Sequence, residues 1–88
     1  MTGQEEEETR ELERLRWRSR RGLLETDVLL QRFVNRHLAG LEREERDCYA
    51  ELLALDDNTL LDYVLGRKPV KLRWQGLIRR IGETDGMS

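Results

Sequence analysis

The chain has 88 residues, which suits one domain and leaves no room for two, and its net charge is −2. A single cysteine, Cys48, excludes an internal disulfide, and with His37 as the one histidine no four-ligand zinc site can form. No apolar run is long enough to cross a membrane, and the acidic start lacks the pattern of a secretory or mitochondrial signal, so we expect a cytoplasmic protein.

The periodicity predicts an all-α fold, a compact single-domain bundle of about five short helices. Apolar residues recur at helical spacing, and no stretch alternates as a half-buried strand would. We expect a disordered acidic lead over 1–8, a helical domain over 9–82 and a frayed tail over 83–88. The predicted helices span residues 9–20, 23–38, 42–53, 58–65 and 70–81.

The first two helices differ in character. On the first, Leu12, Leu15 and Ser19 form one inward stripe. The second is the most apolar and carries leucines and valines outside its main face, so we expect it to pack on two sides at the centre of the bundle. Gly40 is a natural stop after it.

The later helices carry end signals. The third begins in an acid-rich turn at Glu42, which suits the positive end of the helix dipole. Asp56 and Asp57 offer N-cap chemistry for the fourth helix, and Gly66 fits its C′ position, with Pro69 shortly beyond. These short connections predict that neighbouring helices fold back on one another.

Charge is segregated along the chain. Residues 10–21 hold six arginines against two glutamates, and residues 67–80 hold six cations and no acid. The stretch between them, 22–65, is acidic, with ten acids and four arginines. If the two basic segments meet in the fold, they form one positive surface suited to an acidic partner.

Catalytic candidates are scarce. No hydroxyl residue lies in a nucleophile motif, and His37 and Cys48 both fall on apolar stripes, where ordinary packing is the favoured interpretation. The sequence has no glycine-rich phosphate loop. We therefore expect a protein that is not an enzyme, with no metal site and no catalytic residue of its own.

The most informative stretch lies around the end of the first helix. A helical phase that turns Leu15 inward places Trp17 outward beside Arg14, Arg18 and Arg21, which is typical of a contact hot spot. The alternative is that Trp17 packs across another helix under arginine side chains. Gly22 and Glu25 also allow two interpretations: a capping box at the second helix, or a surface that grips a partner beside Arg21.

Together, Trp17, Arg20-Arg21-Gly22, Glu25 and Asp27 resemble the R-G-x-x-E region of the succinate dehydrogenase FAD assembly (flavinylation) factors, the bacterial SdhE-like family. The resemblance continues through Asp56–Gly66, similar to that family's D-D-x-x-L-L-x-[WY]-L-x-G segment, and the apolar final helix. It covers about residues 10–81. One departure is Glu42, which stands where the family often has a serine and is expected to weaken that cap.

The resemblance implies a five-helix factor that binds the flavoprotein subunit of succinate dehydrogenase, or of fumarate reductase, and promotes covalent FAD attachment. FAD and the histidine it joins belong to the client, and no cofactor stays on the factor, which we expect to be a monomer. The resemblance also implies partner-binding roles for five residues. These are Arg21, Gly22, Glu25, Trp17 and Asp27.

Two alternatives remain open at this point. Two basic segments and two tryptophans could suit a nucleic-acid-binding or antitoxin-like regulator, although the acidic middle and a pI near 5.5 argue against a nucleic-acid surface. The other alternative is a helical interaction module with an unrelated client.

Overall fold

The computed structural model describes residues 2–86, with side chains over residues 6–83, and within that range it contains helices and no strands. The all-α prediction is confirmed. The elements in chain order are α1 (Thr2–Arg18), α2 (Leu24–His37), a 3₁₀ turn (Leu38–Gly40), α3 (Arg43–Leu53), α4 (Asp57–Val64) and α5 (Leu72–Gly86).

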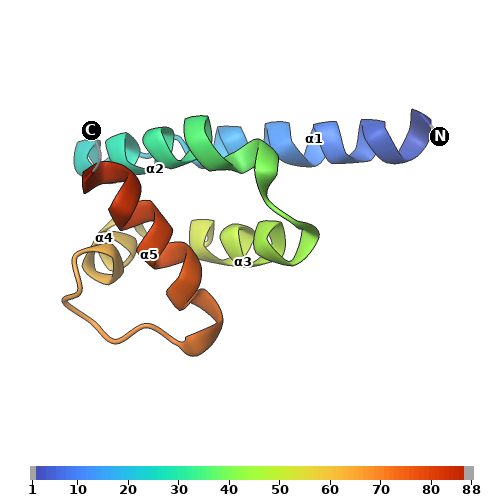
Figure 1. The fold of residues 1–88 in the computed structure, drawn as a ribbon. Helices are drawn as coiled ribbons and strands as arrows, with labels where there is room; N and C mark the ends of the chain where they lie inside the picture. The colour runs from blue at the N-terminus through green and yellow to red at the C-terminus, as the bar shows by residue number, and fades with distance from the viewer. Residues whose placement is uncertain (1, 87–88) are drawn as a thin grey trace.

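Helix α1 begins at Thr2, whereas the sequence predicted a disordered lead up to residue 8. Glutamate is a good helix former, and acids in the first turns favour the positive end of the helix dipole. A tertiary contact adds to this, because Arg46 Nε lies 3.0 Å from Glu11 Oε1 and ties α1 to α3. Helix α1 extends beyond the rest of the bundle (Figure 1), and the molecule with this helix measures 44 × 26 × 24 Å.

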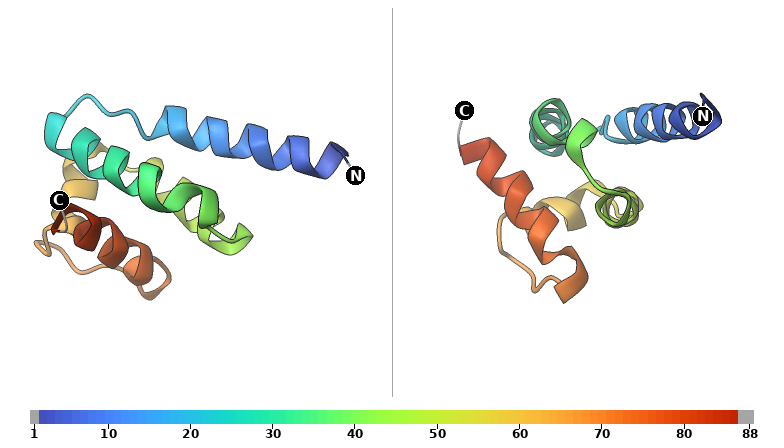
Figure 2. Two further views of the ribbon diagram at one scale, coloured as in Figure 1. Left: turned by 45° about the horizontal axis from the view of Figure 1, so that its top comes forward. Right: turned by 45° about the vertical axis from the view of Figure 1, so that its right-hand side comes forward.

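Helix α2 is central, as predicted. It packs against α5, α4 and the 3₁₀ turn, and in Figure 2 it lies between α1 and α5. The core almost completely buries Leu30 and Phe33 of α2, and Leu38 of the 3₁₀ turn that follows it. Helix α2 therefore stands between α1, which carries most of the first basic segment, and α5, which carries most of the second.

The helix ends follow the predicted chemistry in part. Gly66 has φ 75°, and the Arg67 N–H donates to the Asp62 carbonyl at 2.8 Å, so the Schellman stop of α4 is confirmed. At the start of α3, the Glu42 N–H donates to the Glu45 carboxylate at 2.8 Å, as in a capping box. The predicted tail is helical to Gly86, and residues 87–88 lie outside the described range.

The core is assembled from all five helices. Ser19 is buried together with Leu15, as the stripe on the first predicted helix required. The Ser19 hydroxyl donates to the Leu15 carbonyl at 2.7 Å, so the Tyr49 hydroxyl, 2.6 Å away, donates to Ser19 Oγ. This pair fixes the end of α1 against α3.

Candidate partner-binding surface

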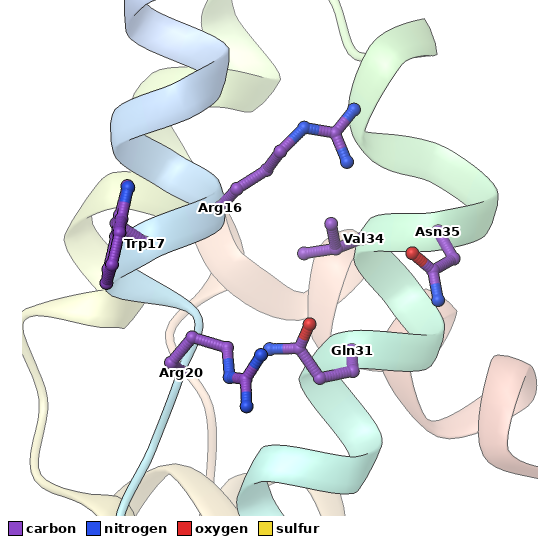
Figure 3. A pocket seen from close by; sticks show the side chains of 6 residues that line it. All are labelled: Arg16, Trp17, Arg20, Gln31, Val34 and Asn35. Atoms are coloured by element: carbon purple, nitrogen blue, oxygen red, sulfur yellow. The ribbon is translucent and has the colours of Figure 1, made fainter.

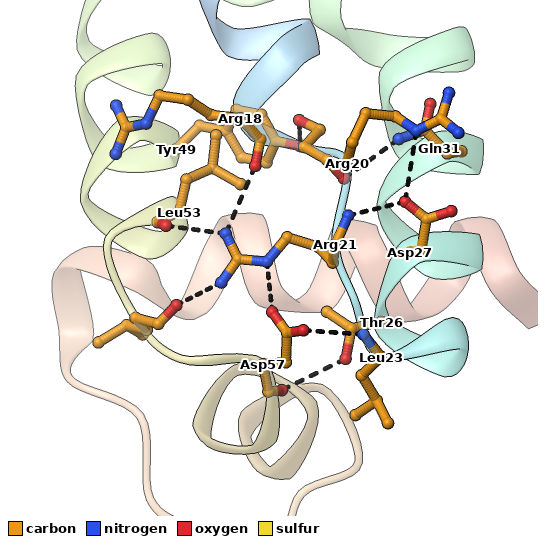
Figure 4. A network of polar contacts seen from close by, with 12 residues as sticks. Arg18, Arg20, Arg21, Leu23, Thr26, Asp27, Gln31, Tyr49, Leu53 and Asp57 are labelled. Carbon is orange, nitrogen blue, oxygen red and sulfur yellow. Dashed lines mark hydrogen bonds and ion pairs between the residues drawn. The ribbon is translucent and has the colours of Figure 1, made fainter.

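The loop between α1 and α2, residues 19–23, is held by an arginine that turns inward. The Arg21 side chain is only 12% exposed, and its Nε lies 2.5 Å from Asp57 Oδ1. The rest of the guanidinium donates to the carbonyls of Leu53, at 2.9 Å, and Leu55. Figure 4 shows Arg21 reaching from the loop toward α4 and the end of α3. The Arg21 side chain therefore holds the loop against α4 and the end of α3 from within the fold.

The Asp57 carboxylate binds the loop at two points, the Arg21 side chain and the Leu23 backbone. Its Oδ2 accepts the Leu23 N–H at 2.9 Å, which satisfies a backbone donor at the start of α2. This hydrogen bond, with that from Arg21, lowers the pKa of the Asp57 carboxyl below its ordinary value. One of the two interpretations of Gly22 and Glu25 was a capping box, and this is wrong because the N-cap of α2 is Leu23, which has no side-chain cap bond. The carboxylate from α4 takes that place.

Asp27 also holds the loop. Its Oδ1 accepts the Arg21 backbone N–H at 2.9 Å and lies 3.7 Å from Arg20 Nε. On the same side, Gln31 Nε2 donates to the Ser19 carbonyl at 3.1 Å. The loop is therefore tied to α2 on one side and to α4 on the other, and its exposed atoms are presented in a fixed geometry.

Gly22 and Glu25 are the members of the predicted site that this arrangement leaves on the surface. A Cβ added at Gly22 would meet nothing closer than Asp57 Oδ2 at 3.9 Å, and φ of Gly22 is not in the left-handed region. The fold thus accepts a side chain at this position. Any requirement for glycine here must come from a molecule that approaches from outside.

Trp17 is 80% exposed, so the alternative in which it packs across another helix is wrong. It borders a hollow of about 230 Å³ between α1 and α2. Figure 3 shows Arg16 and Arg20 extending toward α2, while the Trp17 ring lies on the side of α1 away from it. Arg21 was expected beside Trp17, but it turns to Asp57 because residues 20–22 have left the helix.

The five predicted residues therefore fall into two groups. Trp17, Gly22 and Glu25 are exposed, whereas Arg21 and Asp27 organise the loop from within. Sequence reasoning missed Asp57 as part of this site and predicted only a cap at the start of α4. The signal was present in the paired aspartates, because only one of them was needed as a cap.

His37 and Cys48 are engaged apart from this surface. His37 packs on the Phe33 ring and lies beside Arg80, and burial with that charge lowers its pKa. Cys48 is buried and points to the Arg73 carbonyl at 3.8 Å. Among the side chains described, no cluster of three or more His, Cys, Asp or Glu could hold a metal ion. Over the same residues, no helix is long and apolar enough to span a bilayer.

Comparison with known proteins points in one direction. The model of the family described as "Flavinator of succinate dehydrogenase" matches residues 13–85. The chain is 47% identical over 55 residues to the FAD assembly factor SdhE of Ralstonia nicotianae, an alignment covering 62% of this chain and 58% of that protein. It is 36% identical over 69 residues to the FAD assembly factor SdhE of Coxiella burnetii, covering 77% and 84%.

A third relative, the FAD assembly factor SdhE of Pseudomonas aeruginosa, is 42% identical over 57 residues, covering 65% of this chain and 68% of that protein. The chain thus spans less than two thirds of the Ralstonia relative and more of the other two. No solved structure matches the chain.

Proposed function

The chain belongs to the family of flavinators of succinate dehydrogenase, and we propose that it is an assembly factor which binds the flavoprotein subunit and promotes its covalent attachment to FAD. The observation that carries the proposal is the fixed loop between α1 and α2. It presents Gly22 to the outside, next to the exposed Glu25 in the first turn of α2, while Arg21 is held inside by Asp57.

The proposed contact roles follow from the geometry. Glu25, exposed and near the start of α2, offers a carboxylate to a cation or to backbone N–H groups of the client. Gly22 allows the client backbone to approach closely. Trp17 supplies an exposed aromatic surface on the neighbouring helix. Arg21 and Asp27 act indirectly, as positioning residues that hold the loop in the conformation that the client contacts.

The mechanism we propose is conformational. A factor can promote a reaction on its client only if it binds the reactive conformation more tightly than the others. The FAD-loaded client would be held in the geometry in which its own histidine and flavin react. In this scheme the factor carries out no reaction and retains no FAD.

Several finer points remain predictions. From the sequence we expect fumarate reductase as a further client, a monomeric state and a cytoplasmic location. The nucleic-acid-binding or antitoxin-like alternative is not favoured, because the family and the relatives named above are flavinylation factors.

The test uses Glu25→Ala and Gly22→Arg with the FAD-loaded flavoprotein subunit of the same organism. We expect either change to lower the rate of covalent flavinylation at least about tenfold, as the loss of a contact hot spot would. In-gel flavin fluorescence measures the product, and circular dichroism checks that the fold is retained.

Matched controls are available elsewhere on the surface. Glu44 is an exposed acid on α3, and Gly40 is an exposed glycine at which an added Cβ meets nothing within 4 Å. Glu44→Ala and Gly40→Arg should flavinylate the client as the wild type does. Wild-type rates with the Glu25 and Gly22 variants would refute the site assignment.

A further inference from the structure

A second exposed feature lies directly beside Glu25. A groove of about 430 Å³ runs between α2, the end of α4 and the end of α5. Its rim carries large apolar side chains that are left in water: Leu24 is 73% exposed and Leu65 50%. Leu61 and Val64 form part of its lining. Helices α2 and α5 pack against each other (Figure 2), and residues of both line the groove.

The groove is not required by the packing of the bundle. Leu24 and Val28 lie on the outer face of α2, whereas its neighbours Leu29 and Leu30 are buried. Isolated exposed leucines are normal on protein surfaces. Here, however, side chains from two helices line one hollow, which is typical of an interaction site.

The charges on the rim indicate what kind of segment fits. Glu25 is exposed, and within the part of the chain that the structure describes it makes no ion pair and no side-chain hydrogen bond. Arg32, which also lines the groove, already takes part in another interaction. An apolar segment that brings its own cation would pair with Glu25 while its apolar side chains fill the groove. In a symmetric pairing of two copies, groove against groove, the second copy would bring another Glu25 to this rim instead of a cation.

We propose that this groove binds a segment of the client flavoprotein in which apolar side chains stand next to an arginine or lysine. This inference rests on the proposed function and extends the contact surface from Glu25 along α2 to α4 and α5. Leu24, Val28 and Leu65 contact the apolar side chains, and Glu25 pairs with the cation.

Two pairs of variants test the groove. Leu24→Asp places a charge on the rim, and its control is Leu72→Asp, because Leu72 is 83% exposed but lies outside the groove. Gly82→Leu fills the groove, since a Cβ at Gly82 points to Val64 Cγ1 at 3.9 Å. Its control is Gly76→Leu on the same helix, where nothing lies within 4 Å.

Binding of the full-length variants to the FAD-loaded flavoprotein subunit is measured by titration calorimetry. We expect Leu24→Asp and Gly82→Leu to weaken Kd at least about tenfold, and the two controls to change it by less than about twofold. Wild-type affinity in the groove variants, with weak binding by Glu25→Ala, would overturn the groove inference and leave the proposed function intact. Failure of the wild type to bind would instead overturn the proposed function.

A photo-crosslinking amino acid at position 28 identifies the occupant. The expected product joins Val28's position to a client peptide with apolar residues beside an arginine or lysine. A crosslink to an acidic client peptide, or between two copies of this chain, would overturn the proposal.

Discussion

Replacing Asp57 by asparagine should destabilise the fold through the loop between α1 and α2. The carboxylate accepts from Arg21 Nε at 2.5 Å and from the Leu23 N–H at 2.9 Å. An asparagine has one oxygen and one NH₂ group in these two positions, so one of the two donors would face another donor. The change keeps the volume of the side chain and removes one charge-assisted hydrogen bond.

The magnitude follows from the exposure of the pair. Hydrogen bonds to charged groups contribute about 1.5–3 kcal/mol. The Asp57 side chain is 26% exposed, so water replaces part of the lost bond, and we expect the free energy of unfolding to fall by about 1.5 kcal/mol. For a domain of this size, that lowers Tm by roughly 6–12 °C.

The pH dependence gives a second readout. The pKa of Asp57 is lowered in the folded state, so its contribution is fully present above the unfolded-state pKa and is lost as the pH falls through the folded-state pKa. The gap in stability between the wild type and Asp57→Asn should therefore be largest at neutral pH. It should begin to narrow as the pH falls below about 4, the ordinary range for this carboxyl, and should close at lower pH, below the folded-state pKa.

Urea unfolding followed by circular dichroism, at several pH values, measures both effects. The control is Asp56→Asn, because Asp56 is the N-cap of α4 but makes no side-chain cap bond, and its loss should change stability by less than about 0.5 kcal/mol. Equal stabilities of the Asp56 and Asp57 variants at neutral pH would show that the bonds from Arg21 and Leu23 to Asp57 do not hold the loop.

Two further predictions concern a helix and a buried hydroxyl. Gly76→Ala should stabilise the protein by roughly 0.5–1 kcal/mol, since a Cβ fits at this helical position, whereas Gly66→Ala should destabilise it because φ there is 75°; thermal unfolding compares the two. Burial raises the pKa of Tyr49 to about 12, so stability should be lost as the pH rises above the ordinary tyrosine range, about 10. Alkaline unfolding should show a smaller loss in Tyr49→Phe, and equal losses would contradict this assignment.

Much of the fold could be predicted because its determinants are local. Helical spacing of apolar residues located the central helix, and Gly66 marked the end of α4 by a backbone requirement that glycine satisfies best. The structure extends α1 back to Thr2 through a run of glutamates, which carries no apolar periodicity although glutamate is a good helix former.

The candidate site was harder to predict for a related reason. Arg21 was placed beside Trp17 by continuing a helical phase through residues that are not helical. Its true partner, Asp57, is 36 residues away, and no local pattern specifies such a pairing. Exposure of Trp17 did follow from helical phase, because this residue lies within a helix.

The uneven attachment of α1 has a consequence for how long different parts of the surface persist. The contacts that hold this helix are mainly near its C-terminal end. They involve Leu15, Ser19 and Arg18, and the Arg18 guanidinium donates to the Ala50 carbonyl at 3.1 Å. Much of the length of α1 extends past the bundle. Local opening should therefore release α1 before the central helix unfolds. Hydrogen exchange should accordingly be faster in the first turns of α1 than in the middle of α2, and Trp17, within the fastened end of α1, should be among the last residues of that helix to be released.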